Sequence, residues 1–399
     1  MDSYNSVMKS QFGVQKPTGE DDAEEVAEAE PVGEVPDLLN DSHVYQWAGI
    51  GFGQQELYRL QKSLKKLAAE SQATSLRFFG MIRGTQKDYY IAEGEVGEGD
   101  EGEVERPPEF EAKGTGVNKF TYWVSHQSFG AWTKLPDLSP SDIRASRTIK
   151  VLFTGDLERT IYTNPFFFGK EKDYLRAQIA RISHSTTLVP KGLWKFAEES
   201  VREIVENTPE DDSEMVLPTT AEMNNPDMWL HFKDGILQNC RTAHLEPTDL
   251  PDDVDPEEAM KKVVASDPFD DKLKPISQDS KVVVSKNQKI QPWVVKLMGD
   301  ATEYKTEAGK LVSNGVVVVR SLQWPGSYNF YYQGKTIQVY VGNGHKYEEV
   351  SYFPVHPPTL LSDPDEYELQ PEPTPLTEPV VEEKPKEDGE GDGDGEEDA

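Results

Sequence analysis

The spacing of apolar residues predicts helices and strands in the first half of the chain. Leucines recur every three or four residues between Gln54 and Ser71, which places them on one face of a helix. One-faced apolar patterns also predict helices at 171–182 and 194–207. Two aromatic or β-branched runs flank a turn between residues 76 and 95 and predict a hairpin. Apolar runs predict further strands at 120–124, 148–153 and 160–163.

The composition of the second half of the chain changes at residue 208 and again at residue 281. Residues 208–280 are rich in Pro, Asp and Glu, which predicts a connecting region with short helices. Its clearest helix begins after Asp255, a capping residue followed by Pro256, and we expect it to end near Val264. From 281 onward the chain carries strand-like runs, namely VVV, PWVVKLM, VVVVR, YNFYY and TIQVYV. Asn314-Gly315 and Gln333-Gly334 are typical of turns between antiparallel strands.

These patterns predict an α+β protein with flexible acidic segments. We expect a mixed helical and antiparallel β part followed by a β-rich C-terminal domain, and a disordered acidic arm, loop and tail. The predicted boundaries are 1–35 for the arm, 36–207 for the α+β domain with its acidic loop at 93–111, 208–280 for the connecting region, 281–361 for the β-rich domain and 362–399 for the tail.

Negative charge is concentrated in three segments of the 399 residues. The chain has 72 acidic and 41 basic residues, a net charge of −31. Residues 20–41 hold 10 acidic and no basic residues, 93–111 hold 9 and 1, and 362–399 hold 16 and 2. The rest is close to neutral. Such segments bury too little apolar surface to offset the entropy of ordering, so we predict that they are disordered.

Composition excludes several classes of function. The excess of acidic residues argues against a nucleic-acid partner, because phosphate binding needs a surplus of Lys and Arg. The single cysteine, Cys240, excludes a disulfide framework and a cysteine-based zinc site. No apolar run reaches the roughly 18 residues of a membrane span, and no signal peptide is recognisable near Met1. We therefore expect a soluble intracellular protein.

Short motifs that suggest catalysis or cofactors do not complete their patterns. The run AGIGFG at 48–53 has Gln54 where a dinucleotide fingerprint needs glycine. Gly334-Lys335-Thr336 lies between two predicted strands and lacks the first glycine of a phosphate loop. Both runs are interpreted as turns, and we predict no cofactor.

Cys240 and His244 are four residues apart, a spacing that suits a nucleophile and its base on a helix. However, no oxyanion-hole pattern accompanies them, and a buried structural Cys is the commoner case. The acidic run from Asp388 ends in Ala399 where a calcium loop needs Glu. We predict no metal site and no enzymatic activity.

Aromatic residues occur in short dense runs. The chain has 7 Trp, 16 Tyr and 16 Phe, most of which must fill a core. In a strand such as YNFYY alternate rings point to opposite faces, so some are expected to face outward and anchor partners. The residues predicted to bind partners are Trp123, Phe167, Trp324, Tyr328, Phe330 and Tyr332.

Several long runs resemble a known family, the radial spoke head proteins of the four/six type from motile cilia and flagella. The runs are WAGIGFG (47–53), YYIAEGE (89–95), GTGVNKFTYWV (114–124), FTGDL (153–157), NPFFFGKEKDYLRAQIARISHSTTLVP (164–190), LHFKDGILQNCRTAH (230–244) and WPGSYNFYYQGKTIQVYVGNGHKYEEVSYFPVHPP (324–358).

The resemblance implies a non-enzymatic structural subunit of the radial spoke head, in the axoneme of the cytoskeleton, which helps relay mechanical signals between the central pair and the dynein arms. Implied partners are a copy of itself or a paralogue, a smaller related head protein, a spoke stalk protein and, transiently, central pair projections. Nucleic acid and membrane are not expected partners. We hypothesise that the acidic loop and tail face the central apparatus, where salt screens their charge within about 8 to 10 Å.

Two other hypotheses stay open at this point. An acidic chaperone or histone-binding protein would hold a basic client with the tail at 362–399. An enzyme would use Cys240 or the turn at Gly334, and its activity would be lost in the Cys240→Ser variant.

Overall fold

The structure is a computed structural model that describes residues 33–96, 110–198, 202–207, 217–245, 255–269, 272–285, 288–305, 311–347 and 352–354. The chain divides into two compact units, Met1–Val355 and His356–Ala399, and the described residues all belong to the first. The predicted tail lies outside the described residues. So do residues 1–32 of the predicted arm and residues 97–109 of the predicted acidic loop.

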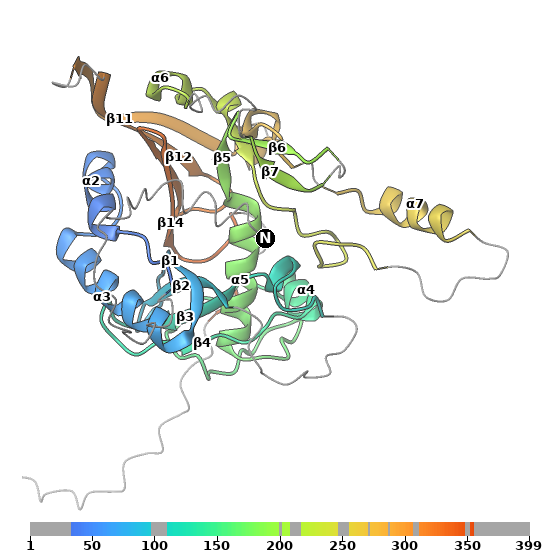
Figure 1. The fold of residues 1–399 in the computed structure, drawn as a ribbon. Helices are drawn as coiled ribbons and strands as arrows, with labels where there is room; N and C mark the ends of the chain where they lie inside the picture. The colour runs from blue at the N-terminus through green and yellow to red at the C-terminus, as the bar shows by residue number, and fades with distance from the viewer. Residues whose placement is uncertain are drawn as a thin grey trace, which may run out of the picture. The chain divides into compact units, whose positions relative to one another are not determined.

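An eight-stranded sheet organises the first unit (Figure 1). The order across the sheet is β11, β12, β13, β14, β1, β2, β3, β4. Neighbouring strands are antiparallel except β1 and β14, which are parallel. The strands are Ala73–Ile82 (β1), Tyr89–Val96 (β2), Thr121–Ser125 (β3), Thr133–Lys134 (β4), Trp293–Lys305 (β11), Leu311–Ser321 (β12), Ser327–Tyr332 (β13) and Lys335–Gly342 (β14).

Parallel pairing of β1 with β14 joins the two halves of the sheet. The ranges 36–207 and 281–361, which the sequence pattern treats as two domains, supply four strands each to this one sheet. At the junction Gly80 pairs with Tyr340 and has φ +145°. A Cβ atom at Gly80 would lie 2.0 Å from the backbone oxygen of Tyr340, so the close approach of the two strands requires glycine.

Both faces of the sheet are covered, which explains the uninterrupted valine run of β12. Val316 and Val318 belong to one hydrophobic core, the first core, which also contains residues of the helices α2 and α3. Val317 and Val319 belong to another, the third core, with Leu188 and Trp229. Successive side chains of a strand point to opposite faces. A strand buried on both faces is therefore apolar at every position.

Two helices, α2 (Leu38–Ala48) and α3 (Gln54–Ser71), cover one face (Figure 1). The predicted bounds of α3 are confirmed, and its leucines are buried in the first core. The structure adds α2, whose N-cap Asp37 accepts hydrogen bonds from two backbone N–H groups of the first turn. The run AGIGFG forms the link between these helices: Gly49 caps α2 with φ +66°, and Gly53 is the N-cap of α3.

The opposite face is covered by α5 (Glu171–Thr186), against which α4 (Pro140–Thr148) packs. The helix predicted at 171–182 is therefore confirmed and runs four residues further. Tyr174, Leu175, Ile179 and Ile182 of α5 belong to the second core. This core also receives Tyr89, Ile91, Tyr122 and Val124 from the sheet. The other side of α5, with Ala177 and Ala180, packs in a fourth core with Val117, Leu138, Ile143 and Cys240.

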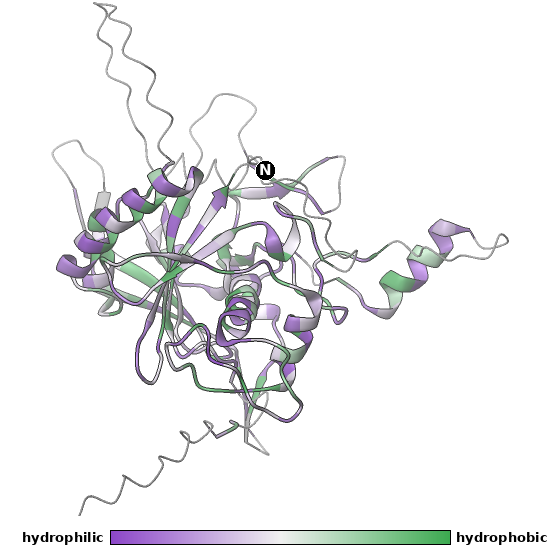
Figure 2. Ribbon diagram, turned by 90° about the horizontal axis from the view of Figure 1, so that it is seen from below, coloured by the Kyte–Doolittle hydropathy of each residue, from purple (hydrophilic) through white to green (hydrophobic). Residues whose placement is uncertain are grey.

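Shorter elements complete the described part. They are the 3₁₀ turns η1 (Gly116–Asn118), η2 (Pro226–Met228) and η3 (Ile276–Gln278), the helices α6 (Thr220–Met223) and α7 (Pro256–Ser266), and the strands β5 (Leu188–Pro190), β6 (Trp194–Phe196), β7 (Ile204–Glu206), β8 (Trp229–His231), β9 (Val282–Ser285) and β10 (Gln288–Ile290). The predicted helix after Asp255 is confirmed as α7. It contains no buried residue, and Figure 2 shows hydrophobic and hydrophilic residues interspersed along it. In the described part, no helix is both long and apolar enough to cross a membrane.

The helix predicted at 194–207 is wrong. The structure has an antiparallel pair there, β6 and β7, in which Phe196 pairs with Ile204. Trp194 and Ile204 are both buried in one small core, so their shared face arises across two strands. The β-branched residues of this stretch favour strands over a helix.

Three smaller predictions also differ from the structure. The strand predicted at 148–153 is absent: Thr148 is the last residue of α4, and residues 149–153 alternate between buried and more exposed positions in an irregular segment. Residues 160–163 contribute only an isolated bridge from Thr160 to Lys170. Asn314 and Gly315 are not a turn: they lie inside β12, opposite Asp300 and Gly299, next to an irregularity in the pairing. The α+β class itself is confirmed, and so are the hairpin of β1 with β2 and the turn at Gln333-Gly334.

Candidate functional site

Four of the six aromatic residues predicted to bind partners are buried. Trp123, Phe167, Trp324 and Phe330 are at most 5% exposed, while Tyr328 and Tyr332 are half-buried and pack against the first core. They do not form one cluster: Phe167 and Trp324 belong to the second core, and the others belong to or pack on the first. Their role as partner contacts stays a prediction. Their burial favours a role in the core, because both faces of β13 are covered.

Two neighbouring phenylalanines are exposed instead. In the run from 166 to 168, Phe167 is buried in the second core, whereas Phe166 is 49% and Phe168 is 90% exposed. The two exposed rings meet edge to face with centroids 4.9 Å apart, an arrangement that aromatic pairs prefer. We call them the exposed phenylalanine pair. They precede α5 in an irregular segment, so strand alternation did not identify them.

The edge strand β11 is a second exposed feature. Among the described residues, β12 is the only strand that pairs with it. Trp293 and Val295 pack against the third core, but Leu297, Met298 and Tyr304 are between 36% and 48% exposed. An edge strand presents backbone N–H and C=O groups to which a strand of another chain can pair. The sequence pattern predicted this strand but not its position at the edge.

A buried cluster of three charges links the sheet to the chain that follows β8. We call Arg77, Glu93 and Lys233 the charge triad. Arg77 and Glu93 are cross-strand neighbours on β1 and β2 and form an ion pair. The Nζ atom of Lys233 lies 3.3 Å from Glu93 Oε1 and 2.6 Å from Ser183 Oγ. The three side chains are 11%, 1% and 10% exposed.

Titration behaviour in the charge triad follows from burial and from its two cations. Burial by itself raises the pKa of the Glu93 carboxyl, but Arg77 and Lys233 together outweigh it and hold the pKa at about 2. Burial lowers the pKa of the Lys233 ammonium to about 8, and repulsion by Arg77 adds to this effect although Glu93 opposes it. At neutral pH the ionised Glu93 carboxylate therefore forms ion pairs with both Arg77 and Lys233.

The two residues that bound the predicted acidic loop, Glu93 and Glu111, are buried in the folded structure. Glu93 lies inside β2 and is buried. At the other predicted end, the buried carboxylate of Glu111 accepts hydrogen bonds from the Val117 N–H and from both the N–H and the hydroxyl of Thr242. Both terminal glutamates are thus part of the folded structure, because each has buried hydrogen-bond donors to satisfy it.

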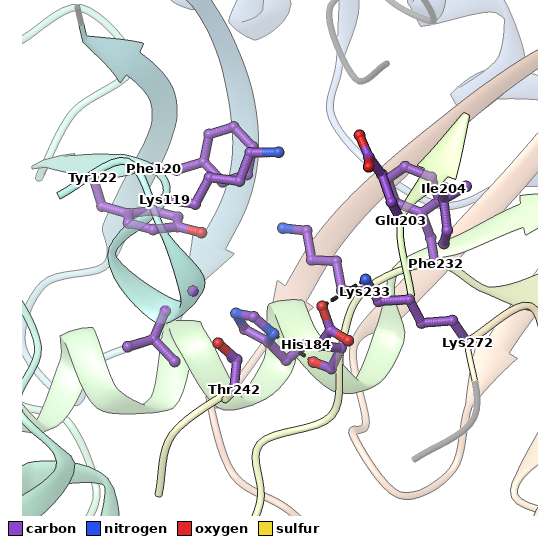
Figure 3. Close-up of a pocket in the computed structure, with 13 residues that line it drawn as sticks. Lys119, Phe120, Tyr122, His184, Glu203, Ile204, Phe232, Lys233, Thr242 and Lys272 are labelled. Carbon is purple, nitrogen blue, oxygen red and sulfur yellow. Dashed lines mark hydrogen bonds and ion pairs between the residues drawn. The ribbon is translucent and has the colours of Figure 1, made fainter. Parts of the chain in front are cut away.

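A cavity of about 260 Å³, which we call the triad cavity, lies beside Lys233. Figure 3 shows Lys119, Phe120 and Tyr122 on one side, Glu203, Ile204, Phe232 and Lys272 on the other, and His184 and Lys233 between them. Burial, with the nearby Lys233 charge, lowers the pKa of His184 to about 4, so its ring is neutral at pH 7. Its Nδ1 atom lies 2.7 Å from the backbone oxygen of Asp234.

The charged groups of the triad cavity are engaged in structural contacts. Asp234 forms ion pairs with Arg202 and Lys272, the latter at 2.7 Å. Lys233 also lies 4.9 Å from the ring centroid of Phe120, a cation–π contact. In the described part of the chain, no hydrogen bond joins a Ser, Thr or Cys side chain to a His ring. The arrangement fastens the segment after β8 to α5 and to the sheet.

The remaining sequence candidates do not assemble into a site. Cys240 is buried and lies in an irregular segment, with its Sγ 3.6 Å from Arg147 Nη1. His244 instead stacks edge to face on Phe269. Lys335 of the Gln333-Gly334 turn forms an ion pair with Asp41 of α2. Within the described ranges, no group of three His, Cys, Asp or Glu side chains is placed to hold a metal ion. The acidic run from Asp388 lies outside them.

Comparison with known families decides which group of proteins this chain resembles. The sequence profile described as "Radial spokehead-like protein" matches residues 2–112 and 103–385, which is most of the chain. The chain belongs to the radial spokehead-like family. The resemblance found in its sequence motifs is therefore confirmed.

Individual members of the radial spokehead-like family align with most of the chain. Radial spoke head protein 6 homolog A of Mus musculus is 29% identical over 425 residues, covering 92% of this chain and 56% of the relative. Radial spoke head protein 4 homolog A of Homo sapiens is 30% identical over 396 residues, covering 88% and 52%. Flagellar radial spoke protein 4 of Chlamydomonas reinhardtii is 29% identical over 350 residues, covering 83% and 70%. The chain spans about half the length of the two animal relatives.

Proposed function

We propose that this chain is a non-enzymatic structural subunit of the radial spoke head, in the axoneme of motile cilia or flagella. In that position it would help relay mechanical signals between the central pair and the dynein arms. The observation that carries the proposal is the family match, which extends from residue 2 to residue 385. The names of its relatives refer to radial spokes and, in one case, to the flagellum.

The proposed partners are other proteins of the spoke. We infer that the chain assembles with a copy of itself or a paralogue, a smaller related head protein and a stalk protein, and meets central pair projections transiently. Two features of the fold support a role in assembly: the exposed phenylalanine pair and the second edge of β11, to which no other strand of the described residues pairs. Exposed aromatic rings are typical anchors of protein interfaces.

The test is co-purification of the tagged full-length chain with axonemal proteins from ciliated cells. We expect the wild-type chain to bring down spoke proteins, and the double variant Phe166→Ser/Phe168→Ser to recover at least threefold less of them. Phe166 is about half exposed and Phe168 is almost fully exposed, so the variant should keep the thermal unfolding midpoint close to that of the wild type. The matched control is Phe129→Ser, which also removes an exposed ring, 62% exposed, from another loop.

Failure would be visible in two ways. If no axonemal protein co-purifies with the wild-type chain, the proposed function is refuted. If the double variant and Phe129→Ser behave alike, the exposed phenylalanine pair is not the anchor. Removal of residues 362–399 tests the chaperone alternative, since salt-sensitive capture of histones that depends on this tail alone would favour a basic client.

A further inference from the structure

The solvent side of α3 carries four cationic side chains. Arg59, Lys62, Lys65 and Lys66 are all exposed, and their helical spacing places them opposite the leucines that α3 buries in the first core. We call these four residues the basic face of α3. Clustered cations of this kind attract acidic groups, so the face is suited to a partner that carries several carboxylates.

The acidic residues of α3 contribute little to this face. The Glu56 carboxylate accepts a hydrogen bond from the Tyr90 hydroxyl at 2.6 Å, which directs it toward β2. Glu70 lies 3.6 Å from Lys66, but both side chains are more than 60% exposed, and an ion pair between exposed groups stabilises little. The basic face can therefore exchange this contact for one with a denser array of carboxylates.

The described part of the chain begins beside the C-terminal end of α3. Glu34 N–H donates to the backbone oxygen of Thr74, three residues beyond the end of the helix, at 3.1 Å. Gly33 is so close to the same stretch that an added Cβ atom would lie 1.8 Å from the Ala73 backbone oxygen. Residues 1–32 are therefore joined to the structure next to the helix that carries the basic face.

The acidic arm has the charge and the length to cover the basic face. Residues 20–32 contain 7 acidic and no basic residues. An extended chain of this length spans about 43 Å, at about 3.3 Å per residue. The 18 residues of α3 extend over about 27 Å. From their attachment next to Ala73, these acidic residues can reach every turn of the helix.

We propose that the basic face of α3 binds residues 20–32 of the same chain. Tethering supports this choice of occupant, because a linked segment has an effective concentration in the millimolar range. A contact with a dissociation constant of about 1 mM is then about half occupied. An acidic segment of another protein has to displace the arm to reach α3. The proposal does not depend on the role of the chain in the radial spoke.

The experiment measures the acetylation rate of individual lysines in the full-length chain by mass spectrometry, with acetic anhydride as the reagent. Nearby carboxylates keep an ammonium group protonated and so lower its reactivity. In the arm variant all 7 acidic residues of 20–32 are replaced by Gln or Asn. We expect Lys62, Lys65 and Lys66 to react about twofold faster in this variant than in the wild type at about 20 mM salt, and equally fast at about 1 M salt.

Two controls separate the arm from other causes. Lys261 of α7 has a side chain that is 75% exposed and should react at the same rate in both chains. The loop variant replaces the 6 acidic residues of 97–109 by Gln or Asn. It tests the other acidic segment that is attached near α3, because Val96 pairs with Ala73. We expect the three lysines to stay close to the wild-type rate in the loop variant, and thermal unfolding verifies the fold of both variants.

A salt-dependent increase confined to the arm variant supports the proposal. It is overturned if the three lysines react alike in the wild type and the arm variant at low salt, if the increase persists at high salt, or if the loop variant gives the larger increase. Dilution distinguishes the same chain from a second copy. An intramolecular contact keeps its protection over about a tenfold dilution, whereas loss of protection assigns the arm to another copy and also overturns the proposal.

Discussion

Replacing Glu93 with Gln tests whether the charge triad stabilises the contact between β2 and the segment after β8. The substitution keeps the size of the side chain and removes its charge, so the buried Arg77 and Lys233 both lose their ion pair with Glu93. At an effective dielectric constant of about 20, unit charges 3.3 Å apart attract by about 5 kcal/mol. Removing one partner of a buried pair typically costs about 3 to 5 kcal/mol.

We therefore expect Glu93→Gln to lower the free energy of unfolding by about 3 kcal/mol or more. The measurement is urea unfolding followed by tryptophan fluorescence and far-ultraviolet circular dichroism, with equal slopes against denaturant required for the comparison. The matched control is Glu70→Gln. Glu70 pairs with Lys66 on the surface of α3, where both side chains are more than 60% exposed. We expect it to change stability by about 0.5 kcal/mol at most.

A second variant separates the charge effect from local damage. In Glu93→Gln/Lys233→Met one of the two buried cations is removed together with the carboxylate. If uncompensated charge is the cause, this double variant should be more stable than the sum of the single variants by about 1 to 3 kcal/mol. Strict additivity would contradict the argument, as would a loss below about 1 kcal/mol in Glu93→Gln alone.

Two further predictions follow from acid titration and from the junction of the sheet. The pKa of Glu93 is about 2 in the folded chain against an ordinary 4.5, so its contribution is full above pH 4.5 and is lost as pH falls toward 2. Unfolding free energy measured across this range should fall by about 3 kcal/mol more in the wild type than in Glu93→Gln, and parallel pH curves would refute the assignment. Gly80→Ala should destabilise the chain by about 3 kcal/mol or more, because of its φ of +145° and the collision with Tyr340. Gly53→Ala, where an added Cβ meets nothing within 4 Å, should cost about 1 kcal/mol or less, with both glycine variants measured by urea unfolding.

Local patterns in the sequence were sufficient for several elements of the fold. The leucine spacing of α3, the cap at Asp255 and the hairpin of β1 with β2 all depend on residues close together in the chain. The 194–207 stretch was misassigned because Trp194 and Ile204 share a face both in a helix and across two short strands. Asn314-Gly315 has the composition of a turn, but pairing with β11 overrides that preference.

Features that depend on contacts between residues far apart in the chain cannot be predicted from these local patterns. Nothing local to β1 indicates that it pairs in parallel with β14. For the same reason the burial of Phe330 and Trp123 was not predicted: strand alternation gives two faces, but only the tertiary fold covers both. The exposed phenylalanine pair lies in a segment that has no regular period. The family resemblance, by contrast, is recognisable from long sequence motifs without knowledge of the fold.

The pairing of β1 with β14 also determines how the protein can be made. β1 ends at Ile82 and β14 begins at Lys335, and at about 5 to 20 residues per second a ribosome needs roughly 10 to 50 seconds to synthesise the intervening chain. During that interval the nascent chain carries an open strand edge with apolar side chains on both sides, which is prone to aggregate. Premature termination upstream of β14 leaves that edge open permanently. Such a fragment is then a substrate for chaperones and proteases instead of a usable half of the protein.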